Sequence, residues 1–313
     1  MRAVQGPTPS IAGRPRRALA QALAVLLIVP VLCAACSPAL ATLRPRPTNS
    51  STGLPVFALA GSPPRLTRVP ISVPPMIWVA TSTVASVPTT RQIATATKWI
   101  KRREGIVGFA VVASDGKLYG YHAHTQFVTA SVVKAMLLVG YLRTHTKLSS
   151  WATSTLGNMI HVSDNNAATA IYHIVGDKGL RAVAAAAAMR NFSVSVSWGR
   201  AQLTPADQAR FFFSMDKLIP KQHDAFARRL LSHIASSQSW GIPSVGRAAK
   251  WQVFFKGGWR TTAQGQLVHQ VARLEKRHTT MAIAVMTNGD PSMVYGIATI
   301  RGVCSILVGS AVR

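Results

Sequence analysis

Segments with strand-like alternation stand on both sides of a long helical stretch, and this order limits the fold most. Apolar alternation predicts strands over 106–113 and 117–122, and again over 251–255, 266–274 and 280–287. Helical spacing predicts terminal helices over 90–103 and 292–312 and a mostly helical block from about 130 to 249. The order predicts an α+β fold, with an antiparallel sheet flanked by the terminal helices plus a helical lobe. The seam between the two lobes is a natural cleft for a substrate.

Two details refine this outline. Thr204, Pro205 and Asp207 have the residue types that begin a helix. The apolar segment 292–312 contains Arg301, so we expect a helix packed on the sheet rather than a membrane span. Apolar residues form 48% of the 313-residue chain, which is enough for a sizeable core, and Cys304 lies where burial is expected.

The first 36 residues have the pattern of an export signal. Arg14, Arg16 and Arg17 precede the apolar stretch 18–29, and Leu32-Cys33-Ala34-Ala35-Cys36 then resembles a bacterial lipobox with Cys36 as the lipidated residue. An uncleaved membrane anchor and an ordinary cleaved signal remain open. Each alternative places the residues after about 37 outside the cytoplasmic membrane, anchored to it in the first two cases.

Residues 37–88 are rich in Pro, Ser and Thr and contain no acidic residue. Such a composition opposes helices and lacks any periodicity, so we expect a disordered tether between the export signal and a domain spanning 89–313.

The chain is strongly basic, with 35 Lys and Arg against 9 Asp and Glu and a formal net charge of +26. The basic residues are scattered, and no basic run alternates with aromatic residues, so a nucleic acid is not an expected partner. Compositional bias and attraction to an anionic envelope surface both remain open.

The first motif that could carry out a reaction is Ser131-Val132-Val133-Lys134. Residues three apart on a helix share a face, so the two polar side chains of this motif can lie close together. Serine is a weak nucleophile that needs a base, and a lysine serves as that base when burial and nearby positive charge lower its pKa. The apolar residues after Lys134 predict that burial. A surface lysine on a core helix is the structural alternative.

Two further motifs follow in order. Ser163-Asp164-Asn165 favours a helix N-cap, with polar groups pointing into the cleft. Lys256-Gly257-Gly258-Trp259 ends the strand predicted over 251–255, where glycines allow a ligand close to the backbone and Lys256 can hold a carboxylate. A simple turn between two strands is the alternative for this last motif.

The ordered set resembles the class A β-lactamases and penicillin-binding proteins, from about Thr89 to the C-terminus. The resemblance implies that Ser131 attacks the carbonyl of a β-lactam or a peptidoglycan stem peptide and that Lys134 takes its proton. It implies that Ser163 relays a proton to the departing nitrogen, that Asn165 holds the substrate amide and Lys134, and that Lys256 meets the substrate carboxylate. The backbone amides of Ser131 and Trp259, beside Gly258, would form the oxyanion hole.

Three features depart from that family. Gly257 stands where the family has a hydroxyl residue, and the spacing from Ser131 to Ser163 is short, so we expect a trimmed helical lobe. The only glutamates are Glu104 and Glu275, and neither lies on the loop that carries the deacylating glutamate in class A β-lactamases. Asp177 and Asp207 are the acids in that part of the chain, and both are better explained as helix-start residues.

The sequence therefore predicts an exported, monomeric serine hydrolase that forms an acyl-enzyme on Ser131 and releases it slowly. A D-alanyl carboxypeptidase or transpeptidase, and a non-catalytic lipoprotein that binds cell-wall peptides, are the alternatives. No cofactor is expected. We expect no metal either, because His122 and His124 could touch one ion but have no third ligand near them in sequence.

Overall fold

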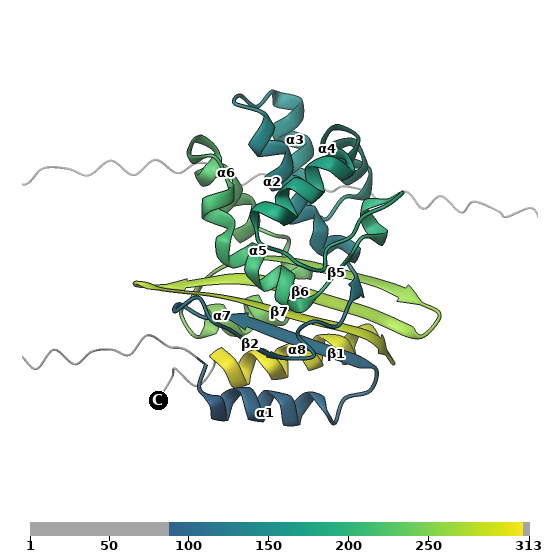
Figure 1. Cartoon of the computed structure of the whole chain (residues 1–313), viewed down its shortest axis with the longest axis vertical. Coiled ribbons are helices and arrows are strands. Elements are labelled where there is room, and N and C mark those ends of the chain that lie inside the picture. The colour runs from purple at the N-terminus through teal and green to yellow at the C-terminus, as the bar shows by residue number, and fades with distance from the viewer. Residues whose placement is uncertain (1–87, 309–313) are drawn as a thin grey trace, which may run out of the picture. The chain divides into compact units, whose positions relative to one another are not determined.

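An antiparallel sheet lies between helices in the computed structural model, which describes residues 88–308 (Figure 1). The predicted export signal, Cys36 and the predicted tether up to residue 87 lie outside the described residues. Within the described part, no helix is long and apolar enough to cross a membrane.

The sheet takes strands from both sides of the helical block, as predicted. Its order is β2-β1-β7-β6-β5, and the strands are β1 Ile106–Val112, β2 Leu118–Tyr121, β5 Gln252–Thr262, β6 Gly265–Lys276 and β7 Thr279–Asp290. Strand β1 pairs antiparallel with β7, with Phe109 opposite Val285. Strand β5 lies at the edge of this sheet, and among the described strands it pairs with β6 alone.

One face of the sheet is covered by α1 Thr90–Ile100, α7 Ile242–Ala248 and α8 Met293–Val308 (Figure 1). The Trp99 indole of α1 donates a hydrogen bond of 3.2 Å to the Thr299 carbonyl of α8. Helix α8 also packs on β6 and β7, as predicted. Cys304 within it is fully buried, and burial raises the pKa of its thiol.

Helix α5 Pro205–Leu218 packs on β1, β6 and β7 and lies on the opposite face of the sheet (Figure 1). It begins with the predicted cap, because the Thr204 hydroxyl accepts from the Asp207 amide and the Asp207 side chain accepts from the Thr204 amide. The Asp207 carboxylate also accepts from the amides of Arg190 and Asn191, at 2.7 and 3.2 Å.

The helical lobe stands beyond α5 (Figure 1). Its α-helices are α2 Lys134–Thr144, α3 Ser150–His161, α4 Asn165–Ala186 and α6 Asp224–Ser232. Short 3-10 helices occur at η1 Ala130–Val133, η2 Trp198–Arg200, η3 Lys221–His223 and η4 Ser236–Gln238, and β3 Phe127–Val128 pairs with β4 Gln202–Leu203. Helix α2 is buried from Lys134 to Leu142 and is the central helix of the lobe.

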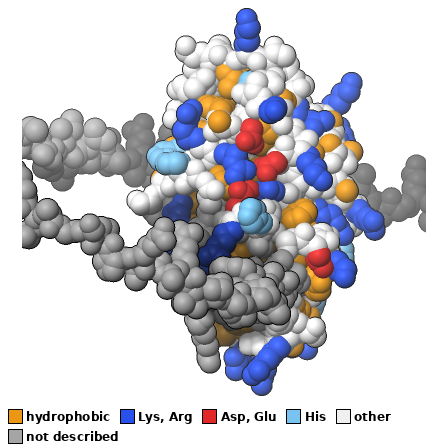
Figure 2. Space-filling model, turned by 90° about the vertical axis from the view of Figure 1, so that its left-hand side faces the viewer, with side chains coloured by type: hydrophobic (Ala, Val, Ile, Leu, Met, Phe, Trp, Pro, Cys, Tyr) orange, Lys and Arg blue, Asp and Glu red, His pale blue; other side chains and the backbone are white. Residues whose placement is uncertain are grey.

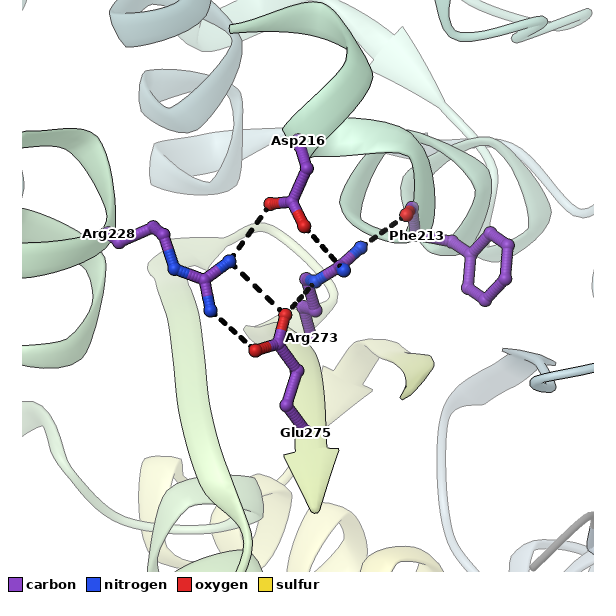
Figure 3. A network of polar contacts seen from close by, with 5 residues as sticks. All are labelled: Phe213, Asp216, Arg228, Arg273 and Glu275. Atoms are coloured by element: carbon purple, nitrogen blue, oxygen red, sulfur yellow. Dashed lines mark hydrogen bonds and ion pairs between the residues drawn. The ribbon is translucent and has the colours of Figure 1, made fainter. Parts of the chain in front are cut away.

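A partly buried ion-pair network ties α5, α6 and β6 together (Figure 3). Arg228 and Arg273 each contact both Asp216 and Glu275, and Arg273 donates to the Phe213 carbonyl. Burial alone would raise the pKa of Glu275, but hydrogen bonds from the two guanidinium groups outweigh it and lower that pKa. On the face shown in Figure 2, Lys and Arg are widespread while acidic side chains gather mostly in one central area.

Strand β5 corrects one prediction. The sequence suggested that the strand ends at Phe255, with a simple turn at Lys256–Trp259 as the alternative, but it continues to Thr262. Strand β6 pairs with it along this length, with Lys256 opposite Val271 and Gly258 opposite His269. Pairing with a long neighbour overrides the weak strand preference of two adjacent glycines. The motif therefore lies within a strand at the sheet edge.

Candidate active site

Ser131 lies at the junction between the strand β3 segment and the central helix α2. The predicted helix is present, but its first turn is the 3-10 helix η1, and Lys134 is the first residue of α2. Side chains at positions i and i+3 eclipse in a 3-10 helix, so Ser131 and Lys134 still share one side. Ala130, just before the serine, has a φ of 44°. Ser131 is half-buried, and its Oγ has no hydrogen-bond partner within the described residues.

The Lys134 ammonium is fully buried and uses three acceptors. It donates to the Ser163 carbonyl at 2.6 Å, to Asn165 Oδ1 at 2.7 Å and to Ser163 Oγ at 3.2 Å. Burial lowers the pKa of Lys134 to about 8, against the opposing charge of Asp164. Burial therefore lowers the pKa of Lys134 as predicted. The expected nearby positive charge is not what acts on it, because the negative charge of Asp164 raises this pKa. At pH 8 about half of the molecules carry a neutral amine that can accept a proton.

The Ser163–Asn165 motif brackets this lysine and begins a helix. Asp164 is the N-cap of α4, and its carboxylate accepts from the Ala167 amide at 2.6 Å. Ser163 has a φ of 60°, in the left-handed region that non-glycine residues seldom adopt. This conformation places both its carbonyl and its hydroxyl within reach of Lys134 Nζ, and such backbone outliers often occur at functional sites.

Lys256 reaches the same serine from the sheet. Its ammonium donates to Ser163 Oγ at 3.0 Å and to the Gly257 carbonyl at 2.9 Å, and its side chain is fully buried. Burial first, and the positive charge of Lys134 second, lower the pKa of Lys256 well below its ordinary value. A carboxylate bound here would supply a compensating negative charge and raise the pKa of Lys256 again.

Gly258 brings the edge strand into contact with the nucleophile. A Cβ atom on Gly258 would lie 2.7 Å from the Ser131 amide nitrogen and 2.9 Å from that of Val132. These distances are too short for any side chain, so only glycine allows this approach of the two backbones. The Ser131 amide therefore lies beside the strand that also carries the Trp259 amide, the pair predicted to form an oxyanion hole.

Two indoles stand on the other side of the motif. The rings of Trp240 and Trp259 meet edge to face, with centroids 6.0 Å apart and an interplanar angle of 67°. A Cβ atom on Gly257 would lie 3.4 Å from Trp259 and 3.8 Å from Trp240, so this position has room for a small side chain. Trp259 is 36% exposed, which leaves its ring available to a substrate.

His269 was missed in the sequence and holds the nucleophile segment on the sheet. It is fully buried on β6, its Nδ1 accepts from the Thr287 amide at 3.2 Å, and its Nε2 donates to the Val128 carbonyl at 2.9 Å. Burial lowers its pKa to about 4, so the ring is neutral. Val128 is three residues before Ser131. The available signal was a lone histidine in the middle of a predicted strand, and β6 is buried at every position around it.

Trp198 was also missed. Lys134 Nζ lies 4.9 Å from the centre of its ring, and its indole nitrogen donates to Thr169 Oγ1 at 3.2 Å. Thr129 Oγ1 donates to the Trp198 carbonyl at 3.3 Å, which ties this loop to the segment before Ser131. An aromatic ring thus covers one side of the lysine that the sequence predicts as the base. Nothing in the local pattern around Trp198 indicates this long-range contact.

The nine acidic residues of the chain all lie within the described residues. Asp207 is committed to its helix cap and two loop amides, and Asp177, which follows the kink at Gly176, accepts from Tyr172 and pairs with Arg181. Asp216 and Glu275 belong to the ion-pair network. Asp164 is the one acid whose charge bears on Lys134 within the part of the chain described. The other four acids lie elsewhere in the fold. The β1–β2 turn contains Asp115 and the α1–β1 connection contains Glu104. The first turn of α6 contains Asp224, and β7 ends at Asp290.

No three His, Cys, Asp or Glu side chains between residues 88 and 308 are grouped closely enough to bind a metal ion. His122 stacks on Tyr121, and its Nδ1 contacts the Val107 carbonyl at 3.2 Å.

Comparison with known proteins relates this arrangement to one family. The model of the β-lactamase enzyme family matches residues 145–310, which is more than half of the chain. The chain belongs to the β-lactamase enzyme family. The matched range contains Ser163, Asn165, Lys256 and Gly258, whereas Ser131 and Lys134 precede it. A search of curated proteins gave no match.

Solved structures of β-lactamases and of PBP-A share the fold. A β-lactamase from Sphaerobacter thermophilus is similar at 18% identity with a TM-score of 0.62, over 72% of this chain and 98% of that one. A class A β-lactamase from Bacteroides cellulosilyticus gives 16% identity and a TM-score of 0.62, over 72% and 98%. PBP-A gives 14% identity and a TM-score of 0.61, over 72% and 97%. The predicted α+β fold and the predicted superfamily are both confirmed.

Proposed function

We propose that this β-lactamase-family protein forms an acyl-enzyme on Ser131 with β-lactams or D-alanyl peptides and releases the acyl group slowly. The observation that carries the proposal is the convergence of Lys134, Ser163 and Lys256 beside a serine whose amide touches Gly258. Three separate segments contribute to this cluster. It has a nucleophile, a buried amine that can accept a proton, a hydroxyl that can relay one, and a cation for a carboxylate.

Acylation follows from these positions. The neutral amine of Lys134 takes the proton of Ser131 Oγ, and the oxygen attacks the carbonyl carbon of the amide. The Ser131 and Trp259 amides stabilise the oxyanion, an effect worth about 3 kcal/mol per donor. The C–N bond then breaks. The departing nitrogen receives a proton from Ser163 Oγ, which regains one from Lys134 or Lys256, since both ammonium groups donate to it.

Release of the acyl group needs an activated water molecule. A positioned base adds about 10²–10⁴-fold to such a step, but the acids of the loop region, Asp177 and Asp207, are engaged elsewhere. The Trp198 ring also occupies space beside Lys134. These two features support slow hydrolysis, and a D-alanyl carboxypeptidase or transpeptidase that passes its acyl group on slowly would share them.

We also propose that the protein works outside the cytoplasmic membrane, anchored through its N-terminal segment. The basic and apolar pattern of residues 14–36 supports this location, as does a substrate class that belongs to the cell envelope. Metabolic labelling with a lipid precursor tests it, because Cys36→Ala removes the label if Cys36 is the lipidated residue.

Labelling with a fluorescent penicillin tests the acylation proposal. The full chain is incubated with the reagent, digested, and the labelled peptide identified by mass. We expect the label on Ser131, and none on Ser131→Ala, with Ser149→Ala as a control serine in a helix cap of the same lobe. An unlabelled wild-type protein would show a binding protein without this chemistry. Equal labelling of Ser131→Ala would show that another residue is acylated, and it would reject Ser131 as the nucleophile. A D-Ala-D-Ala peptide assay then separates the peptidase from the β-lactamase.

A further inference from the structure

A cavity of about 490 Å³ is lined in part by segments that also carry or contact residues of the catalytic cluster. Phe127 and Val128 precede the turn of Ser131, Arg200 ends the 3-10 helix that begins with Trp198, and Arg260 follows Gly258 on β5. We call this cavity the arginine pocket, after Arg200 and Arg260. No step of the proposed acylation uses it.

The lining of the arginine pocket favours an anion. Both guanidinium groups are exposed, and neither has an ion pair or a side-chain hydrogen bond with another described residue. The remaining polar lining consists of uncharged side chains such as Gln202, Thr262 and Asn288, and none of the described residues that line it is acidic. An arginine fork matches the two oxygens of a carboxylate. Two unpaired forks at one cavity therefore suit a carboxylate-bearing group.

Strand geometry relates the pocket to the serine. Alternate residues of a strand face the same side, so Lys256, Gly258 and Arg260 follow one another on one face of β5 at spacings of about 7 Å. Gly258 lies against the Ser131 amide. A substrate on Ser131 thus has Lys256 on one side and Arg260 on the other. If Lys256 takes the carboxylate of the leaving half, the arginine pocket faces the acyl half.

We propose that the arginine pocket binds a carboxylate on the acyl half of the substrate, away from the amide that Ser131 attacks. The inference rests on the proposed function and narrows its substrate class to acyl donors with an anionic side chain. Each exposed ion pair changes an affinity by up to about fivefold. Two such pairs predict a preference of about twofold to twenty-fivefold for the anionic donor over a neutral one.

Three penicillins with one shared core measure this preference. Benzylpenicillin has a neutral side chain, and its α-carboxy and α-amino analogues add a negative and a positive charge at the same carbon. We expect the second-order acylation rate constant to fall in the order α-carboxy, benzyl, α-amino. The double variant Arg200→Gln, Arg260→Gln should bring the three rates together. Arg91→Gln, which removes one exposed positive charge on α1, should leave the order unchanged.

The result that would overturn the inference is an unchanged order in the double variant, or no preference for the α-carboxy compound in the wild type. If none of the three acylates the wild type, the proposed function fails instead. Equilibrium binding of the α-carboxy and benzyl compounds to Ser131→Ala then decides about the pocket by itself. Tighter binding of the anion that disappears with Arg200→Gln and Arg260→Gln supports the pocket, and equal binding rejects it.

Discussion

Gly258→Ala is the substitution whose effect follows most directly from the structure. The added Cβ would lie 2.7 Å from the Ser131 amide nitrogen, whereas ordinary contacts begin at 3.4 Å, so the edge strand and η1 must separate by about 0.7 Å. A misplacement of about 1 Å in an active site costs about 100-fold in rate. The shift also moves the Ser131 amide away from the position at which it would bind the oxyanion, so we expect acylation to slow by about 100-fold or more.

Gly257→Ala is the matched control, one residue away on the same strand. Its Cβ would meet the nearest atoms at 3.4 and 3.8 Å, which are ordinary contact distances. We therefore expect an acylation rate within about threefold of the wild type, since small changes without a clash are mostly tolerated.

The assay is the rate of covalent labelling by a fluorescent penicillin, with far-UV circular dichroism and a thermal melt on each variant. Overpacking costs about 1–3 kcal/mol, so Gly258→Ala should melt earlier and keep its secondary structure. A folded Gly258→Ala protein that is labelled as fast as Gly257→Ala would refute the proposed contact between β5 and the nucleophile turn.

Three further predictions concern the base, the water and the scaffold. The acylation rate should rise about tenfold per pH unit below pH 8 and level off above it, because burial lowers the pKa of Lys134 to about 8 and the neutral amine is the form that accepts a proton. A rate that does not change between pH 6 and 9 would contradict this. Trp198→Ala should let water reach the acyl group and speed deacylation by less than the 10²–10⁴-fold that a base supplies; unchanged decay of a purified adduct would argue against it. Glu275→Gln should cost about 2 kcal/mol in urea unfolding at pH 7, because it weakens hydrogen bonds between charged groups in a partly exposed network. Because the pKa of Glu275 is lowered in the folded protein, its carboxylate contributes fully to the free energy of unfolding above pH 4.5, and this contribution is lost progressively as the pH falls below that value. The difference in unfolding free energy between wild type and variant should therefore shrink in acid. A difference that stays constant with pH would contradict this reasoning.

The fold could be predicted because each level of the sequence agrees with the next. Alternation gave the strands on both sides of the helical block, and the cap at Thr204 and Asp207 gave the start of α5. The end of β5 could not be predicted locally. Gly257 and Gly258 have low strand preference, and pairing of β5 with β6 determines that the strand continues to Thr262.

The site residues that belong to short motifs, in a fixed order along the chain, could be predicted from the sequence. Ser131, Lys134, Ser163, Asn165 and Lys256 were found as spaced motifs, and the structure brings their segments together.

Trp198 and His269 were not found, because their contacts with Lys134 and Val128 depend on how distant segments return to the same place. The arginine pocket is likewise invisible in sequence, since Arg200 and Arg260 belong to segments sixty residues apart.

Rapid mixing of the protein with a chromogenic cephalosporin tests fast acylation and slow deacylation together, because both steps appear in one trace. We expect a burst of one equivalent of product per protein molecule, followed by a much slower steady rate. Ser131→Ala should give neither phase. Fast linear turnover without a burst would contradict slow deacylation, and a wild-type protein that gives no burst and no turnover would contradict acylation itself.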